Sequence, residues 1–220
     1  MRNTLAVALP EHAQRPATLK LCTAPGEPTP SSRLPVLTSA NDIREFVRYL
    51  NRQPSGVVPA EELDRSKRRL FEERKLSAYR NLGITEERGG SLILSPYGRA
   101  LAARLEPETQ AFRELLTGIH LYVAAVEWMY ERNLEVVTTT DLVAFWRSLD
   151  NDIDEFHKPD SSKGAAISFF SLCEAAELGT LTLGKRGHTT RLNIDRQQLF
   201  RFVQSDSREV GSPCDLIDIT

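Results

Sequence analysis

Cysteine is scarce in this chain of 220 residues, which has only Cys22, Cys173 and Cys214, far apart in the sequence. Three scattered cysteines cannot supply a disulfide framework or a CxxC metal knuckle, so reduced thiols are expected. Long apolar runs are also missing, because no stretch reaches the roughly 18 apolar residues that a membrane-spanning helix needs. The first residues have too few apolar side chains for the roughly 7–15-residue core of a secretory signal. We therefore expect a cytoplasmic protein without a membrane span.

Catalytic and metal-binding motifs are missing as well. The chain has none of the GxxxxGK[ST], GxGxxG, HExxH or GxSxG patterns of phosphate, dinucleotide, zinc or nucleophile sites. The four histidines are His12, His120, His157 and His188. None has a cysteine or carboxylate at ligand or triad spacing that the inferred fold would bring close to it. The acidic run from Asp150 is not a calcium loop, because Glu155 and Ser161 replace the required glycine and glutamate. The sequence thus predicts a non-enzymatic protein with no metal site and no cofactor.

The chain also has no excess of positive charge. The chain has 28 lysines and arginines against 30 aspartates and glutamates, which gives a net charge of -2 and a pI near 6.1. A protein coated with basic residues is therefore excluded. Any surface that binds nucleic acid must be local, with acidic regions elsewhere balancing it.

Proline, in contrast, is concentrated near the N-terminus, where six of the twelve prolines lie within the first 35 residues. Each proline removes a backbone donor and fixes φ, so this stretch cannot form helices or central strands. Residues 1–38 are therefore predicted to be a disordered or extended Pro-rich arm. Ser39 can cap the first helix, in which apolar residues recur at helical spacing from Ile43 to Leu50.

The most informative stretch is 66–105, which reads as a basic helix, a tight hairpin and another helix. The basic helix is predicted over about 67–82. Strands are predicted at Ile84–Glu86 and Ser91–Leu94, around a turn made by two glycines. Ser95 and Pro96 then begin the next helix, since proline suits the first helical position.

The second half of the chain repeats this order. One long amphipathic helix is predicted over about 110–132, followed by an extended pair at Val136–Val137 that corresponds to Val57–Val58 in the first half. A helix capped by TTTD at 138–141, a helix from about Ser161, a hairpin over 180–194 and a closing helix at 197–203 follow. The predicted fold is mainly α with small β-hairpins (α+β). The expected boundaries are 1–38 for the arm, 39–105 for unit one, 106–205 for unit two and 206–220 for a C-terminal tail.

Two segments carry a resemblance to a known family. LGITEERGGSLILSPYGRALA, residues 82–102, resembles the third-helix end and wing of bacterial winged helix-turn-helix proteins. FFSLCEAAELGTLTLGKRGHTTRLNI, residues 169–194, resembles the second half of an uncharacterised group of bacterial tandem winged-helix proteins. The resemblance covers about residues 40–203. It implies two tandem winged-helix units, a fold often used for double-stranded DNA and sometimes only for protein contacts.

Positive charge is concentrated in the first basic helix. Between Arg65 and Arg80 there are seven basic and two acidic residues, a local balance of +5. The third helix of such a unit lies in the major groove, where arginine pairs with guanine or phosphate. The other interpretation is a solvated helix face with glutamate–arginine pairs. The candidate DNA-binding residues in this helix are Lys67, Arg68, Arg69, Arg74, Lys75 and Arg80.

The second hairpin is the other candidate contact. Its tip places cations and a histidine between glycines, as in wing tips that meet phosphates, although a charged soluble turn has the same composition. The candidate DNA-binding residues here are Lys185, Arg186, His188 and Arg191. The turn of the first hairpin, 86–90, has a net charge of -1 and is a poor phosphate binder. The helix before the second hairpin is poor in cations and is predicted to be buried or packed against a partner.

The leading functional hypothesis is a double-stranded DNA-binding protein, as in transcription regulation or as the DNA-binding component of a bacterial system. The alternative is a protein–protein interaction subunit, an adaptor or homodimer, which docks through unit two and the predicted 110–132 helix without contacting DNA. The acidic region 131–160, with eight acidic against three basic residues, favours this alternative.

Overall fold

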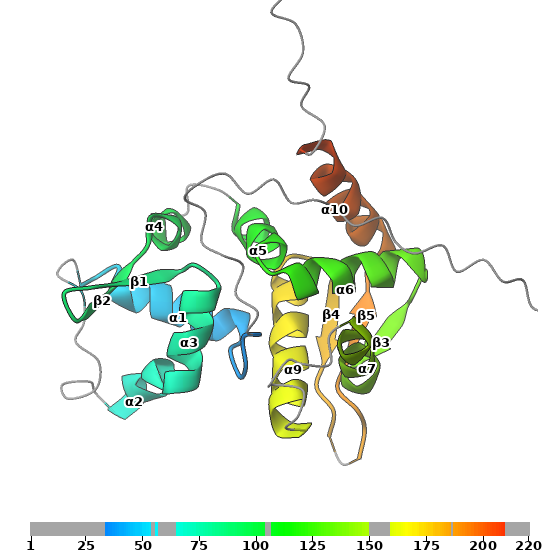
Figure 1. Ribbon diagram of the computed structural model, residues 1–220, viewed down its shortest axis with the longest axis horizontal. Helices are drawn as coiled ribbons and strands as arrows, with labels where there is room; N and C mark the ends of the chain where they lie inside the picture. Colours follow the sequence, from blue (N-terminus) through cyan, green and yellow to red (C-terminus); the bar gives the residue numbers. More distant parts are fainter. Residues whose placement is uncertain are drawn as a thin grey trace, which may run out of the picture.

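The computed structural model describes residues 34–53, 56, 65–103, 107–149, 159–185 and 187–209. It confirms an α+β protein that is mostly helical and has two small antiparallel sheets (Figure 1). The first half of the described chain contains α1 (Ala40–Leu50), α2 (Arg65–Arg68), η1 (Arg69–Phe71), α3 (Glu73–Asn81), β1 (Thr85–Arg88), β2 (Ser91–Leu94) and α4 (Pro96–Ala103). The second half contains α5 (Glu108–Thr117), α6 (His120–Glu131), β3 (Val136–Thr138), α7 (Thr139–Leu149), α9 (Pro159–Ala175), β4 (Gly179–Thr182), β5 (Arg191–Ile194) and α10 (Arg196–Glu209).

The basic helix is not continuous, so the prediction of one helix over 67–82 was wrong. A short helix and a 3-10 turn precede Glu72, whose backbone is extended (φ -61°, ψ 138°), and α3 begins after it. Leu70 and Tyr79 are both fully buried. Nine residues at about 100° each would place these two side chains on opposite faces of one straight helix. The break at Glu72 lets both of them enter the same core.

The predicted 110–132 helix is likewise divided into α5 and α6. Gly118 follows α5, and Ile119 is extended (φ -124°, ψ 112°) before α6 begins at His120. Glycine is among the weakest helix formers, so a change of direction costs little here. The break allows α5 to pack on α9 while α6 packs on α7 and α10 (Figure 1).

Among the described residues, the two sheets differ in their number of strands. In the first half β1 pairs with β2, whereas in the second half the strand order is β3–β5–β4. The predicted extended pair Val136–Val137 is confirmed as part of β3, and it pairs with Asn193 and Leu192 of β5. Its expected counterpart, Val57–Val58, lies outside the described residues. α4 packs very close to the first hairpin, because a Cβ at Gly98 would collide with the carbonyl oxygen of Ile84.

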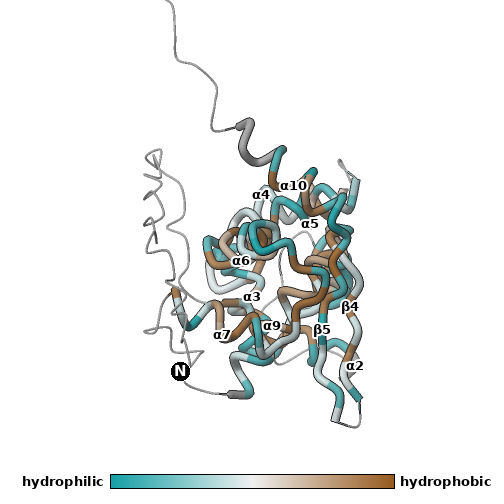
Figure 2. The backbone as a smooth tube through the Cα atoms, turned by 90° about the vertical axis from the view of Figure 1, so that its right-hand side faces the viewer, coloured by the Kyte–Doolittle hydropathy of each residue, from teal (hydrophilic) through white to brown (hydrophobic). Residues whose placement is uncertain are grey.

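The two halves share one continuous hydrophobic core. The middle of this core is α9, which contacts α5, α7 and α1 (Figure 1). Apolar segments gather in the interior where these helices meet (Figure 2). The chain before α1 lies close against α9, since a Cβ at Gly164 would be 3.0 Å from Cγ1 of Val36.

Two side-chain hydrogen bonds attach this same segment to α9. The backbone N–H of Thr38 donates to Oγ of Ser168 at 2.9 Å, and the N–H of Ala40 donates to Oγ of Ser171 at 3.0 Å. Both bonds are buried. Because buried donors without partners are costly, these serines fix where α1 begins relative to the second half.

Candidate nucleic-acid interface

The predicted basic helix forms a segment of three elements, α2, η1 and α3, which we call the basic segment (residues 65–81). Lys67 and Arg68 lie on α2, Arg69 on η1, and Arg74, Lys75 and Arg80 on α3. Their surroundings differ sharply, because some of these cations are bound by carboxylates of the chain itself.

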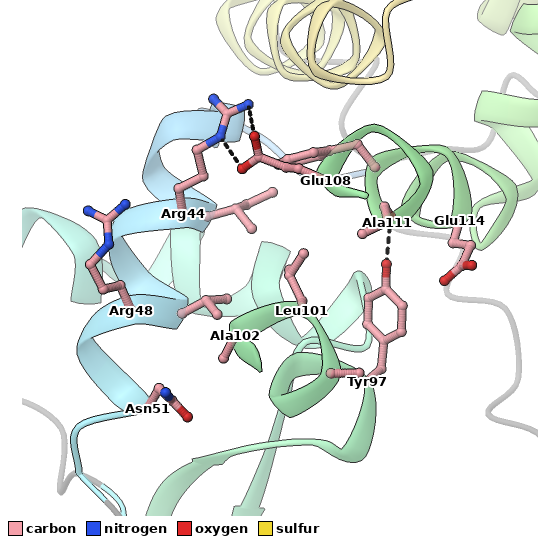
Figure 3. A pocket seen from close by; sticks show the side chains of 13 residues that line it. Arg44, Arg48, Asn51, Tyr97, Leu101, Ala102, Glu108, Ala111 and Glu114 are labelled. Carbon is pink, nitrogen blue, oxygen red and sulfur yellow. Dashed lines mark hydrogen bonds and ion pairs between the residues drawn. The ribbon is translucent and has the colours of Figure 1, made fainter. Parts of the chain in front are cut away.

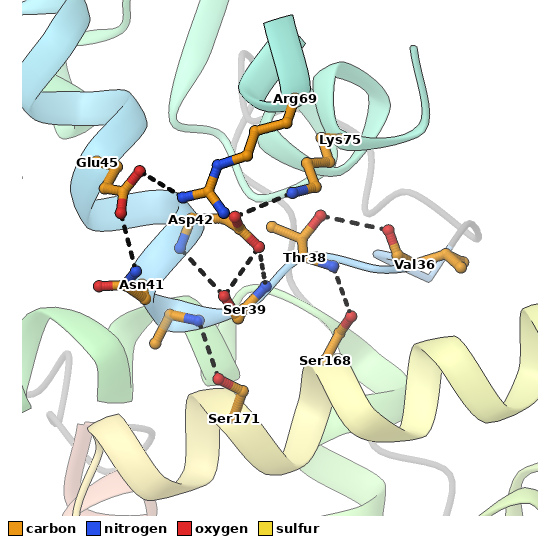
Figure 4. Close-up of polar contacts among 11 residues, drawn as sticks. Val36, Thr38, Ser39, Asn41, Asp42, Glu45, Arg69, Lys75, Ser168 and Ser171 are labelled. Carbon is orange, nitrogen blue, oxygen red and sulfur yellow. Dashed lines mark hydrogen bonds and ion pairs between the residues drawn. The ribbon is translucent and has the colours of Figure 1, made fainter. Parts of the chain in front are cut away.

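Lys75 is a structural cation. Its Nζ donates to Oδ1 of Asp42 at 2.9 Å, and the two side chains keep only 12% and 13% of their exposure (Figure 4). The other carboxylate oxygen of Asp42 accepts from the backbone N–H and the hydroxyl of Ser39, which completes the capping box of α1. Burial raises the pKa of Asp42, but the hydrogen bonds from Lys75 and Ser39 outweigh it and hold that pKa below its ordinary value.

Arg69 is also bound within the chain, although at the surface. One of its guanidinium nitrogens is 2.7 Å from Oε2 of Glu45, whose other oxygen accepts from the side-chain amide of Asn41 (Figure 4). The hydrogen bond from Arg69 is the main cause that lowers the pKa of Glu45. Arg69 can leave this exposed pair for another anion at small cost, whereas Lys75 cannot leave Asp42.

Arg80 forms two long ion pairs, at 3.6 Å to Glu73 on α3 and at 3.8 Å to Glu87 on β1. The carboxylates of Asp42, Glu45 and Glu87 come from outside the basic segment. They reduce its local net charge from +5 to +2.

Arg68 and Arg74 are the cations that remain. Both are exposed, and neither forms an ion pair with any residue that the structure describes. Lys67 is half-buried beside Glu45, whose pKa it helps to lower. The basic segment therefore offers fewer free charges than its sequence indicates.

The second hairpin, β4–β5 with its loop (residues 179–194), is the basic hairpin. Lys185, His188 and Arg191 are all exposed, and none of them pairs with a carboxylate in the described parts of the chain. Arg186 lies outside the described residues. Arg191 alternates with buried Leu192 on β5, so its side chain is on the outer face of the sheet.

α9, which precedes the basic hairpin, is enclosed by its own chain. From Ser162 to Cys173 only Lys163 is exposed, because α1, α5 and α7 cover the helix. The predicted burial of this helix is confirmed, and the residues that cover it belong to the same chain. Burial also raises the pKa of the Cys173 thiol, which is therefore a core residue rather than a reactive one.

The structure brings one part of each region to the same end of the molecule, but it does not bring the two regions to one spot. α2 and the tip of the basic hairpin both lie at the lower end in Figure 1, on opposite sides of the molecule. β1 and β2 lie higher and to the side. Sequence reasoning missed Asp42 and Glu45, the carboxylates that bind the predicted cations. They are 33 and 24 residues from their partners, a separation for which no local pattern exists.

Among the described residues, no group of three or more histidine, cysteine or acidic side chains could hold a metal ion. The acidic run from Asp150 to Asp154 lies outside the described part. No described helix combines the length and the apolar character that crossing a membrane requires. Comparison with protein-family models, with curated proteins and with solved structures found no match to this chain.

Proposed function

We propose that this protein binds double-stranded DNA without catalysing a reaction, as a regulator or as the DNA-binding component of a larger system. The contacts would come from the basic segment, through Arg68 and Arg74, and from the basic hairpin, through Lys185 and Arg191. His188 and the exposed ion-paired Arg69 and Arg80 would add contacts at the edge of this surface.

The order of elements supports a reading of each half as a winged-helix unit. In the second half the sequence α6, β3, α7, α9, β4, β5, with β3 paired to β5, is the order typical of that fold. In the first half α1, α3, β1 and β2 follow in the same order among the described elements. α3 and α9 would then be the two third helices.

The observation that carries the proposal is the placement of uncompensated cations. Arg68, Arg74, Lys185 and Arg191 are exposed and lack an ion-pair partner among the described residues. α2, which carries Arg68, and the loop of the basic hairpin, which carries Lys185, lie at the same end of the molecule (Figure 1). Arginine and lysine side chains of this kind neutralise phosphates and release counterions. Apart from these four cations the chain has 24 basic against 30 acidic residues, so the rest of it has no excess of positive charge.

The burial of α9 determines how the second half of the chain would contact DNA. A helix covered on three sides by its own chain cannot enter a major groove, so the basic hairpin would contact the phosphate backbone instead. α3 keeps an exposed face with Arg74 and would lie toward the groove. Base reading would be limited to α3, and phosphate contacts would supply most of the affinity.

The interaction-subunit hypothesis has less support. It rests on the net charge of -2, on the acidic region 131–160 and on the apolar faces of the helix before the second hairpin and of the 110–132 region. Those faces are used inside the chain, where Phe112, Leu116, Phe169 and Phe170 are all fully buried. A surface already covered by its own chain cannot dock a partner unless the fold opens.

The test is a fluorescence-anisotropy titration of duplex DNA at several salt concentrations. Two double variants, Arg68→Ala/Arg74→Ala and Lys185→Ala/Arg191→Ala, each remove two of the proposed contacts. Each should raise Kd about 10-fold and reduce the slope of log K against log[salt] by about 2. The matched control Arg132→Ala/Arg201→Ala removes two exposed arginines from α10 and the end of α6 and should change Kd less than about 2-fold.

Two results would contradict the proposal. One is the absence of DNA binding at low salt, and the other is an equal loss in the control, which would show general charge attraction. Size-exclusion chromatography with light scattering then tests the alternative, because a homodimer would elute at twice the mass of 24.7 kDa.

A further inference from the structure

A cavity of about 470 Å³ opens between α1, α4 and α5 (Figure 3), and none of the proposed DNA contacts is among its lining residues. This volume is within the range of small-ligand sites. Ile43 and Val47 from α1 and Phe112 from α5 line the cavity but are buried. The apolar side chains that remain partly exposed in it are Leu101 and Ala102 of α4. Such a surface can bury a hydrocarbon chain or ring, which gains about 25 cal/mol for each Å² removed from water.

Most polar groups at the rim are already used. Arg44 donates twice to Glu108, at 2.7 and 3.3 Å, and its guanidinium lies 5.1 Å from the ring centre of Phe112. The hydroxyl of Tyr97 donates to the carbonyl oxygen of Ala111 at 2.6 Å. These bonds tie α5 to α1 and to α4, so the walls of the cavity are held in place (Figure 3).

Arg48 differs from Arg44 and Glu108, the charged pair at the rim, because it has no ion-pair partner among the described residues. It is exposed and lies on α1 one turn after Arg44. Asn51 follows on the same side of the cavity and adds an amide donor. The acidic Glu114, which interacts within the chain, lies at the opposite end (Figure 3). The cavity thus has an apolar interior and, at one end, a cation without a counter-charge in the described chain.

We propose that this cavity binds an amphipathic monocarboxylate, such as a medium-chain fatty acid. The hydrocarbon part would lie on the apolar surface, and the carboxylate would accept hydrogen bonds from Arg48 and Asn51. An anion is favoured at this end because Arg48 has no counter-charge among the described residues, whereas Arg44, the other described cation of the rim, is neutralised by Glu108. This proposal does not depend on DNA binding, and its test measures the ligand directly.

The experiment is isothermal titration calorimetry of the full chain with decanoate, and in parallel with decanol and decylammonium. Decanoate should saturate a single site and bind about 10-fold more tightly than decanol, with decylammonium the weakest. Arg48→Gln should reduce decanoate affinity to the level of decanol and leave decanol unchanged. Arg52→Gln removes a neighbouring exposed arginine that does not line the cavity, and it should change nothing.

A second variant tests the location. Ala102→Trp places a large side chain into the cavity from α4 and should abolish the binding of both decanoate and decanol, with folding checked by circular dichroism. The proposal is overturned if decanoate does not saturate or if decylammonium binds as tightly as decanoate. It is also overturned if decanoate binding survives Arg48→Gln unchanged, or survives a folded Ala102→Trp variant.

Discussion

The basic segment and the basic hairpin carry cations of the same kind, but the chain treats them differently. In the basic segment Lys75, Arg69 and Arg80 are bound by carboxylates, two of which come from α1. In the basic hairpin Lys185 and Arg191 have no counter-charge among the described residues. The comparison shows that the net charge of a segment does not by itself indicate how many phosphates it can bind. Cations that already form ion pairs within the fold must first be left out of the count.

This difference has a structural cause. α3 is held against α1 by Asp42, and α1 in turn is attached to α9 by Ser168 and Ser171. The cation Lys75 therefore fixes the position of α3, and through α1 that of the first half relative to the second. The described cations of the basic hairpin take no part in such an attachment, so they remain free for an external anion.

The largest effect should follow from removal of the counter-charge of Lys75. We expect Asp42→Ala to lower the free energy of unfolding by about 2–3 kcal/mol, because a mostly buried ammonium loses its partner and α1 loses part of its cap. Lys185→Ala in the basic hairpin should change it by less than about 0.5 kcal/mol. Urea unfolding of both variants measures the difference.

A double variant separates the pair from other effects of the substitution. Asp42→Ala/Lys75→Met should recover part of the lost stability, since no unpaired charge remains. Equal losses in Asp42→Ala and Lys185→Ala would mean that the two regions do not differ as described.

The second effect is a dependence of stability on pH. The pKa of Asp42 is below its ordinary value of 3.8 in the folded protein, so the unfolded chain binds this proton more readily. The stabilisation by Asp42 is therefore complete above about pH 4 to 5 and is lost as the pH falls through the folded pKa. Thermal unfolding between pH 2 and 6 should show a loss of Tm at acid pH that is smaller in Asp42→Asn. An unchanged acid profile in this variant would exclude Asp42 as a source of the loss.

The sequence predicts the order of the elements well, because hydrophobic periodicity, caps and glycine turns are local signals. Ser39 caps α1 and the Val136–Val137 pair lies in β3, as predicted. The breaks at Glu72 and Ile119 could not be predicted, because both depend on how distant helices share one core. The same holds for the candidate site. Its cations can be read from the sequence, but the carboxylates that bind them are brought close only by folding.

The smallest expected effect concerns the exposed ion pair between Arg69 and Glu45. The question is whether this pair makes Arg69 less available to DNA. Glu45→Gln removes the partner of Arg69, and we expect it to change the free energy of unfolding by no more than about 0.5 kcal/mol. If the proposed DNA contact is correct, the released guanidinium should strengthen duplex binding about 2-fold. Glu131→Gln, on the exposed end of α6, changes the net charge equally and should leave the affinity unaltered.

Equal gains in both variants would assign the effect to overall charge, whereas a gain only in Glu45→Gln would place Arg69 beside the DNA. Because the hairpin cations have no such partner, no substitution of a carboxylate in the described chain should strengthen their contribution in the same way.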